Sequence, residues 1–121
     1  MLQAVHHVQI SIPVGSEDEA RAFYCGVLGL NEISKPDILK GRGGFWLDLD
    51  GFQIHFGTED GIDRAKTRSH VAFLVEDLDK CRANLTASGF KTLESIPIPN
   101  LNRFEFRDPF GNRIEMLEKI D

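Results

Sequence analysis

The sequence has little of what disulfide-linked, membrane-spanning or nucleic-acid-binding proteins require. Its two cysteines, Cys25 and Cys81, are too few for a disulfide framework and lack metal-binding spacing. No apolar run approaches the roughly 20 residues of a membrane span, and the first residues lack the basic and then apolar layout of a signal peptide. Acidic residues outnumber basic ones by 19 to 14, which argues against nucleic acid or an anionic membrane as a partner. Together with 121 residues, of which 41% are hydrophobic, these absences predict a cytoplasmic globular protein with one core.

The first half of the chain is predicted to begin with a strand and a helix. Residues 5–12 end in a strict alternation of polar and apolar side chains, which is typical of a strand with two unlike faces. Ser16 and Glu19 have the spacing of a capping box and predict a helix over about 17–28. A short strand near Glu32 and a glycine-rich loop follow.

The clearest local signal is a hairpin over residues 45–56. The dipeptide Asp50-Gly51 favours a two-residue type I′ turn, whose central residues need positive φ. This turn would place Trp46 opposite His55 and gather the apolar side chains on one face. The other face would carry four side chains: Trp46, Asp48, Gln53 and His55.

The second half repeats this order of elements. Residues 69–75 are predicted to form a strand and residues 77–88 a helix, and Asp108-Pro-Phe-Gly111 is predicted to turn a last hairpin. His7 maps onto His70 at an offset of 63. Once residues 13–15 are removed, an offset of 60 maps Gly29 onto Gly89, Asp48 onto Asp108 and His55 onto Glu115, without further gaps.

The repeat predicts two strand–helix–three-strand modules, about 4–57 and about 69–118, joined by a linker of about 58–68. Each module would curl into an open cup that cannot close its own core. If the cups pack face to face, the first strand and the last hairpin strand of each module present one side chain to a shared cavity.

Those four positions carry metal-binding side chains: His7, His55, His70 and Glu115. Imidazole nitrogens and a carboxylate suit a borderline divalent cation, with bonds of roughly 2.1 Å. Four such ligands would leave one or two positions for water or substrate. His7, His70 and Glu115 alone would form the two-histidine, one-carboxylate triad that suits ferrous iron.

Other polar residues are open to more than one interpretation. His55 is open to a second interpretation, as a free base or a substrate contact, and Trp46 to two, as packing or as a cavity wall. Gln9 and Gln53, on the polar strand faces, are candidate substrate contacts, and Arg42 in the glycine-rich loop is a candidate for an anionic substrate. A solvated surface charge is the simpler interpretation of three arginines, namely Arg42, Arg103 and Arg107. One histidine, His6, falls on the opposite strand face and is not predicted to be a ligand.

Four segments carry a resemblance to a known family: residues 6–13 (HHVQISIP), 22–30 (AFYCGVLGL), 69–75 (SHVAFLV) and 108–115 (DPFGNRIE). With them the whole chain, 1–121, resembles one domain of the vicinal oxygen chelate superfamily. That superfamily includes glyoxalase I, bleomycin-resistance proteins, fosfomycin-resistance thiol transferases and extradiol dioxygenases.

The resemblance implies an α+β fold in which two tandem βαβββ modules form a cupped, half-barrel sheet around a metal site. It places the metal on His7, His55, His70 and Glu115, with bidentate substrate oxygens and a stabilised enediolate or similar anion. Glyoxalase I usually has a carboxylate at the position of His55, so Glu115 becomes the expected base, with His55 as a second catalytic candidate.

The resemblance leaves three functions open. The first is a glyoxalase-type lyase or isomerase that uses zinc, nickel, iron, manganese or cobalt and acts on a small oxygen-bearing substrate. The second is a small-molecule binding or resistance protein without chemistry, and the third is an extradiol-type dioxygenase. Members of the superfamily commonly pair cups between chains, so a homodimer is expected.

Overall fold

The computed structural model describes residues 1–120 and divides into two compact units, Met1–Ile62 and Asp63–Asp121. Each unit contains one four-stranded mixed sheet with a helical segment between its first and second strands. The fold is therefore α+β, and the boundary between the units falls inside the predicted linker of residues 58–68.

The first unit contains four strands: β1 (His7–Ile12), β2 (Asn31–Ile33), β3 (Phe45–Leu49) and β4 (Phe52–Thr58). Three helical segments join them: α1 (Glu17–Arg21), the π-helical η1 (Ala22–Val27) and the 3₁₀ helix η2 (Asp37–Arg42). The strand order is β1-β4-β3-β2, with β1 parallel to β4 and the other pairs antiparallel.

The second unit has the same topology. Its elements are η3 (Arg64–Lys66), β5 (His70–Leu74), α2 (Leu78–Ala87), β6 (Thr92–Glu94), β7 (Leu101–Arg107) and β8 (Arg113–Lys119). The strand order is β5-β8-β7-β6, again with the first strand parallel to the last. The predicted repeat of strand, helix and three strands is present in both units.

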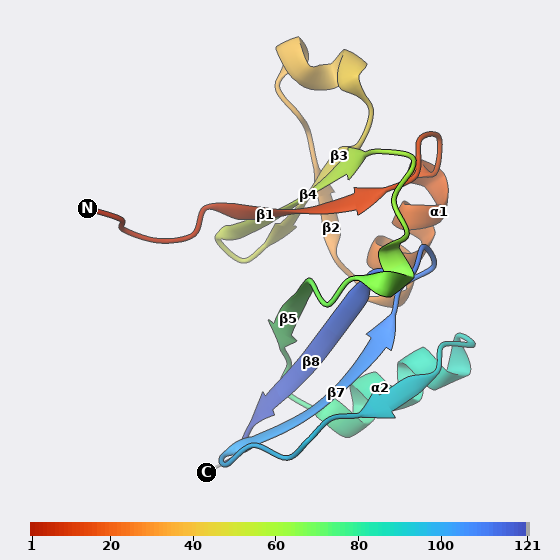
Figure 1. Ribbon diagram of the computed structural model, residues 1–121. Helices are drawn as coiled ribbons and strands as arrows, with labels where there is room; N and C mark the ends of the chain where they lie inside the picture. Colours follow the sequence, from red (N-terminus) through yellow and green to blue (C-terminus); the bar gives the residue numbers. More distant parts are fainter. Residues whose placement is uncertain (121) are drawn as a thin grey trace. The chain divides into compact units, whose positions relative to one another are not determined.

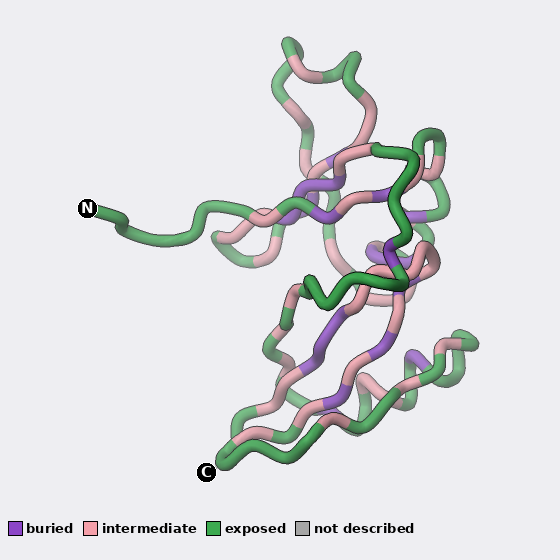
Figure 2. The backbone as a smooth tube through the Cα atoms, viewed as in Figure 1, coloured by how far each residue is buried: buried purple, intermediate pink, exposed green. Residues whose placement is uncertain are grey.

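Each unit has its own apolar core on one face of its sheet. Figure 1 shows α2 packed on the second sheet, and Figure 2 shows the buried stretches along the inner strands β4 and β8. The buried apolar side chains of the first unit are Ile10, Ile12, Ala20, Phe23, Tyr24, Phe45, Leu47, Ile54 and Phe56. Those of the second unit are Leu78, Leu85, Phe104, Phe106, Ile114 and Met116.

The predicted hairpin of the first unit has the expected register. Asp50 and Gly51 have φ values of 45° and 86°, as a type I′ turn requires. Trp46 lies opposite His55 across β3 and β4. A two-residue turn with this geometry leaves only one pairing of the strands, and so the local sequence was sufficient to predict it.

The capping box predicted at Ser16 is wrong. The Ser16 hydroxyl donates a hydrogen bond to the carbonyl of Pro13 at 2.6 Å and caps no helical amide. The carboxylate of Glu17 instead accepts a hydrogen bond from the amide of Gly44 at 3.1 Å. The predicted helix of about 17–28 is present, but it widens after Arg21 into the π-helical segment η1. The second helix matches its prediction more closely, because the Asp77 side chain accepts from the Lys80 amide at 3.0 Å.

The repeat contains a gap that the constant offset of 60 missed. Trp46 pairs with His55, whereas the residue that pairs with Glu115 is Glu105, so the third strands correspond at an offset of 59. The reason is the turn: residues 108–112 form a longer loop in which the Asp108 carboxylate accepts backbone amides, among them that of Asn112 at 2.8 Å. Asp48 and Asp108 are therefore not equivalent, while His55 and Glu115 are.

Two further features bear on function. Cys25 in η1 and Cys81 in α2 are half-buried free thiols, and burial raises the pKa of each, which keeps both protonated near neutral pH. Within residues 1–120, no helix is long and apolar enough to cross a membrane.

Candidate functional site

Three aromatic rings from three strands stack on the face of the first sheet that lies opposite its core. The ring centroids of Trp46 and His55 are 3.9 Å apart, and the two ring planes make an angle of 3°. The ring centroids of His55 and His7 are also 3.9 Å apart, with an angle of 17° between the planes. Trp46 comes from β3, His55 from β4 and His7 from β1. We call these three side chains the ring stack. It brings together the two candidate ligands of the first unit and the candidate cavity wall.

His55 is held as a neutral imidazole in the middle of the ring stack. It is only 6% exposed, and burial, followed by the charges of His7 and His6, lowers its pKa to about 4. Its Nε2 lies 2.9 Å from Gln53 Oε1. Since the amide oxygen can only accept, Nε2 carries the proton and Nδ1 keeps its lone pair. A neutral imidazole with one free nitrogen can bind a cation or accept a proton.

Three other residues of the first unit can now be placed. Gln9 lies against Gly57, where a side chain would collide with the Gln9 amide. Arg42 is exposed at the end of η2 and is not part of the ring stack. His6 precedes β1, and its Nδ1 lies 3.0 Å from His7 Nδ1. His6 therefore lies just outside the strand, and its exclusion from the ligand set stays a prediction.

The second unit brings together the other two candidate ligands. His70 on β5 and Glu115 on β8 approach to 3.3 Å between Nε2 and Oε2. His70 Nδ1 lies 2.9 Å from the carbonyl oxygen of Arg68, to which it donates. In the neutral ring this leaves the lone pair on Nε2, beside the carboxylate. Histidines that bind metals typically donate their other ring proton in this way.

The chemistry and spacing of His70 and Glu115 fit two ligands of a divalent cation. Two ligand atoms that each bond to one cation at roughly 2.1 Å are roughly 3.0 to 3.4 Å apart at octahedral or tetrahedral angles. The observed separation of 3.3 Å between the His70 nitrogen and the Glu115 oxygen lies in that range. Within residues 1–120, no group of three or more His, Cys, Asp or Glu side chains is placed to hold a metal ion.

Arg103 contacts the candidate site directly, which the sequence interpretation as a solvated charge missed. Its Nη1 donates to Glu115 Oε1 at 2.8 Å, and its side chain is only 18% exposed. Its Nε and Nη2 donate to the carbonyl oxygen of Ile96 at 3.0 and 2.6 Å. Arg107, another supposed surface charge, donates to the carbonyl of Gly111 at 3.1 Å. Alternation along β7 was the available signal, because it places both arginines on the face that carries Glu115.

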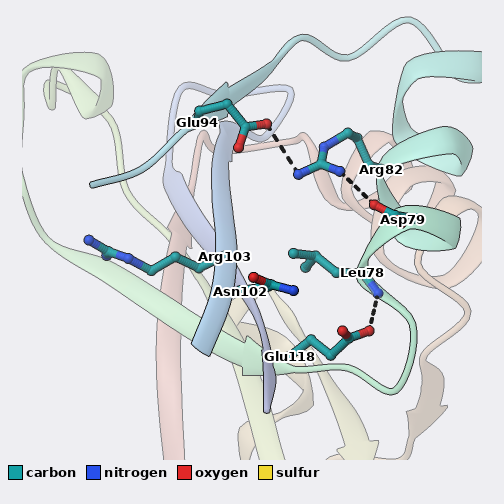
Figure 3. A pocket seen from close by; sticks show the side chains of 7 residues that line it. All are labelled: Leu78, Asp79, Arg82, Glu94, Asn102, Arg103 and Glu118. Atoms are coloured by element: carbon teal, nitrogen blue, oxygen red, sulfur yellow. Dashed lines mark hydrogen bonds and ion pairs between the residues drawn. The ribbon is translucent and has the colours of Figure 1, made fainter. Parts of the chain in front are cut away.

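A pocket of about 240 Å³ in the second unit is lined by residues of α2, β6, β7 and β8, Arg103 among them. Figure 3 shows Arg103 extending away from the side on which Asn102 and Leu78 lie. The charged groups of the pocket are already engaged. Arg82 pairs with Asp79 at 2.9 Å and with Glu94 at 3.1 Å, and Glu118 accepts from the Leu78 amide at 2.8 Å (Figure 3). The Arg82–Glu94 and Leu78–Glu118 contacts tie α2 to its sheet, and they give the pocket a structural role.

The duplicated strand–helix–three-strand topology places the chain in a class of α+β proteins built from two repeated four-stranded units. The sequence matches the model of the Glyoxalase/Bleomycin resistance protein/Dioxygenase superfamily over residues 4–116. The chain belongs to this superfamily.

Solved structures agree with that assignment. A crystal structure described as a glyoxalase family protein from Bacillus anthracis is 42% identical, with a TM-score of 0.92 and coverage of 99% of this chain and 98% of that one. The fosfomycin resistance protein FosX from Listeria monocytogenes, complexed with Mn(II) and sulfate, is 16% identical, with a TM-score of 0.80 and coverage of 99% and 93%.

A third structure, the antibiotic-binding protein TnmS3 from Streptomyces, is 18% identical, with a TM-score of 0.74 and coverage of 98% of both chains. At these low identities, the likeness to FosX and to TnmS3 shows a shared fold. No curated protein matches the chain significantly.

Proposed function

We propose that the chain is a divalent-metal-dependent enzyme of the glyoxalase type, a lyase or isomerase that acts on a small oxygen-bearing substrate. Its metal ligands would be His7 and His55 from the first unit and His70 and Glu115 from the second. The observation that carries the proposal is the His70–Glu115 pair, in which the Arg68 carbonyl orients the imidazole so that its Nε2 faces a buried carboxylate.

The first unit supports the same function. The burial of His55 keeps its ring neutral at pH 7, the state in which imidazole binds metals. A bound cation would polarise two oxygens of the substrate and stabilise negative charge that develops on them.

The protein itself would supply the proton transfer and hold the substrate. Oε2 of Glu115, the carboxylate oxygen that Arg103 does not hold, is the candidate to accept a proton from substrate carbon and to return it, and His55 Nδ1 is the alternative base. Gln9, Gln53 and Trp46 would contact the substrate beside His55, because they lie on neighbouring positions of the same sheet.

Metal content tests the proposal directly. Protein purified without a tag from metal-supplemented cells should contain about one equivalent of a divalent cation per chain, as measured by elemental analysis. Dialysis against a chelator should remove the cation. Zinc, nickel, iron, manganese and cobalt ions are then added separately, and the ion that the metal-free protein binds most tightly would identify the metal. A wild-type protein that binds none of these ions would refute the proposed function.

Trp46 reports on the candidate site because it is the only tryptophan in the chain. Adding Zn²⁺ to chelated protein should change the Trp46 emission, since the cation would alter the His55 ring that lies 3.9 Å from the indole. The change should be lost in His55→Gln. An unchanged emission in saturating Zn²⁺ would contradict a role for His55 in the site.

Ligand binding without chemistry is a second candidate function, and the ring stack favours it because stacked aromatic side chains suit planar ligands. A binding protein of this kind would show quenching of Trp46 by its ligand that survives chelation. The proposed enzyme would lose both ligand quenching and turnover when the metal is removed.

We also propose that the protein is a cytoplasmic homodimer with a small-molecule substrate and without nucleic-acid or membrane partners. Analytical ultracentrifugation of the metal-loaded protein should give a mass of about twice 13.6 kDa. A mass that stays at that of one chain at micromolar concentration would contradict the dimer.

A further inference from the structure

We propose that Arg103 is a positioning residue that holds Glu115 by one carboxylate oxygen and thereby makes Glu115 a one-oxygen ligand through Oε2. The inference rests on the proposed function, because it concerns how many oxygens of the Glu115 carboxylate bind the cation.

The two oxygens of Glu115 have different partners. Oε1 accepts from Arg103 Nη1 at 2.8 Å, whereas Oε2 lies 3.3 Å from His70 Nε2. A charge-assisted hydrogen bond at 2.8 Å ties up the first oxygen. The second oxygen faces Nε2 of His70, whose Nδ1 donates to the Arg68 carbonyl. The carboxylate is thus oriented with one oxygen committed and one directed toward the other candidate ligand.

Arg103 can orient Glu115 because its own guanidinium is anchored at the opposite edge. Nε and Nη2 both donate to the Ile96 carbonyl, at 3.0 and 2.6 Å, while Nη1 reaches the carboxylate. The planar guanidinium carries rigid donors on separate edges, so anchoring one edge to backbone fixes the direction of the other. The amine of a lysine is a single point of charge and cannot bridge the two acceptors in this way.

Burial makes this anchoring matter. Glu115 is 7% exposed, and a carboxylate at that depth needs charged or hydrogen-bonding partners. Without Arg103 the carboxylate would lose the partner of Oε1, and it would be free to rotate and offer both oxygens to the cation. Outer partners of metal ligands typically contribute 10- to 100-fold to metal affinity.

The same face of the second sheet offers a matched control. Arg113 pairs with Glu105 through Nε and Oε2 at 2.7 Å, and the side chains of that pair are about as buried as Arg103. Glu105 lies directly opposite Glu115 in the β7–β8 ladder, but Arg113 pairs with Glu105, whereas Glu115 pairs with Arg103. Replacing Arg113 therefore removes an arginine–glutamate pair of the same kind without touching the proposed ligand.

The experiment compares the wild type with Arg103→Gln, Arg103→Lys and Arg113→Gln. Co²⁺ affinity is measured by isothermal titration calorimetry, and the Co²⁺ visible absorption spectrum reports the number of ligand atoms. Arg103→Gln should lose about 10- to 100-fold in affinity, and its Co²⁺ bands should weaken as both carboxylate oxygens bind. Arg103→Lys should fall between Arg103→Gln and the wild type, and Arg113→Gln should match the wild type in both measurements.

The outcomes separate the inference from the proposed function. A wild type that binds no Co²⁺ refutes the function itself. A wild type that binds Co²⁺ together with an Arg103→Gln variant of unchanged affinity and spectrum overturns the role of Arg103. Thermal unfolding shows whether each variant is folded. If Arg103→Gln does not fold, Arg103→Lys decides: a lysine variant with wild-type affinity and spectrum also overturns the inference, because charge alone would then suffice.

Discussion

Replacing Glu115 by glutamine should weaken divalent-cation binding by more than about 100-fold, beyond the range for the loss of an outer partner of a ligand. The substitution keeps the size of the side chain but removes the only negative charge in the proposed ligand set, whose other members are three histidines. It also leaves the Arg103 guanidinium beside a neutral amide, so that its charge opposes the cation without compensation. Calorimetric titration of the chelated variant with Co²⁺ or Zn²⁺ measures the effect.

Glu105→Gln is the control for this prediction. Glu105 is the residue that pairs with Glu115 across β7 and β8, and its carboxylate binds Arg113. The control variant removes one negative charge from the same face of the same sheet, and its metal affinity should stay within a few-fold of the wild type. Equal losses in the two variants would mean that the general charge of the sheet face attracts the cation, which would argue against ligation by Glu115.

Replacing Gly44 by alanine should lower the free energy of unfolding by about 2–5 kcal/mol. Gly44 has a φ of 77°, and a Cβ at this position would collide with the carbonyl oxygen of Phe56. The left-handed conformation alone costs an L-residue about 1–2 kcal/mol. The collision adds to this cost, because the obstacle is backbone in the central strand β4 and cannot rotate away.

Gly15→Ala separates the two contributions. Gly15 has a similar φ of 82°, but a Cβ there would meet no atom within 4 Å. Its substitution should therefore cost only the conformational part, about 1–2 kcal/mol, in the same urea unfolding experiment. Equal losses in both variants would show that the contact of Gly44 with β4 contributes nothing. Because Phe56 follows His55, the Gly44 variant should also alter the emission of Trp46 in the folded state.

Much of the fold could be predicted from short stretches of sequence. The Asp50-Gly51 turn determines the pairing of Trp46 with His55, and the alternation in each strand separates the polar face from the core. These features depend on turn geometry and on a side-chain period of two, which need no knowledge of distant residues. The repeat also gave each predicted strand and helix a counterpart in the other half of the chain.

The errors arose where a choice among local interactions depended on residues far along the chain. Ser16 had the spacing of a helix cap, but its hydroxyl donates to Pro13, and Glu17 binds Gly44. Strands β3 and β7 correspond at an offset of 59, whereas β4 and β8 correspond at 60, because the loop before β8 is one residue longer. A comparison at one constant offset cannot detect such a single-residue difference. Arg103 looked like a surface charge because no local pattern predicts its contact with the Ile96 carbonyl.

By itself, the sequence determined the elements, the hairpin register and the two pairs of candidate ligands, since periodicity and turn chemistry act over a few residues. The tertiary structure alone decided what state those candidates are in. It stacks His55 between Trp46 and His7, where burial keeps the ring neutral, and it divides the two oxygens of Glu115 between Arg103 and His70. Desolvation and hydrogen-bond geometry depend on every neighbour in space, and neighbours on separate strands are not adjacent in the sequence.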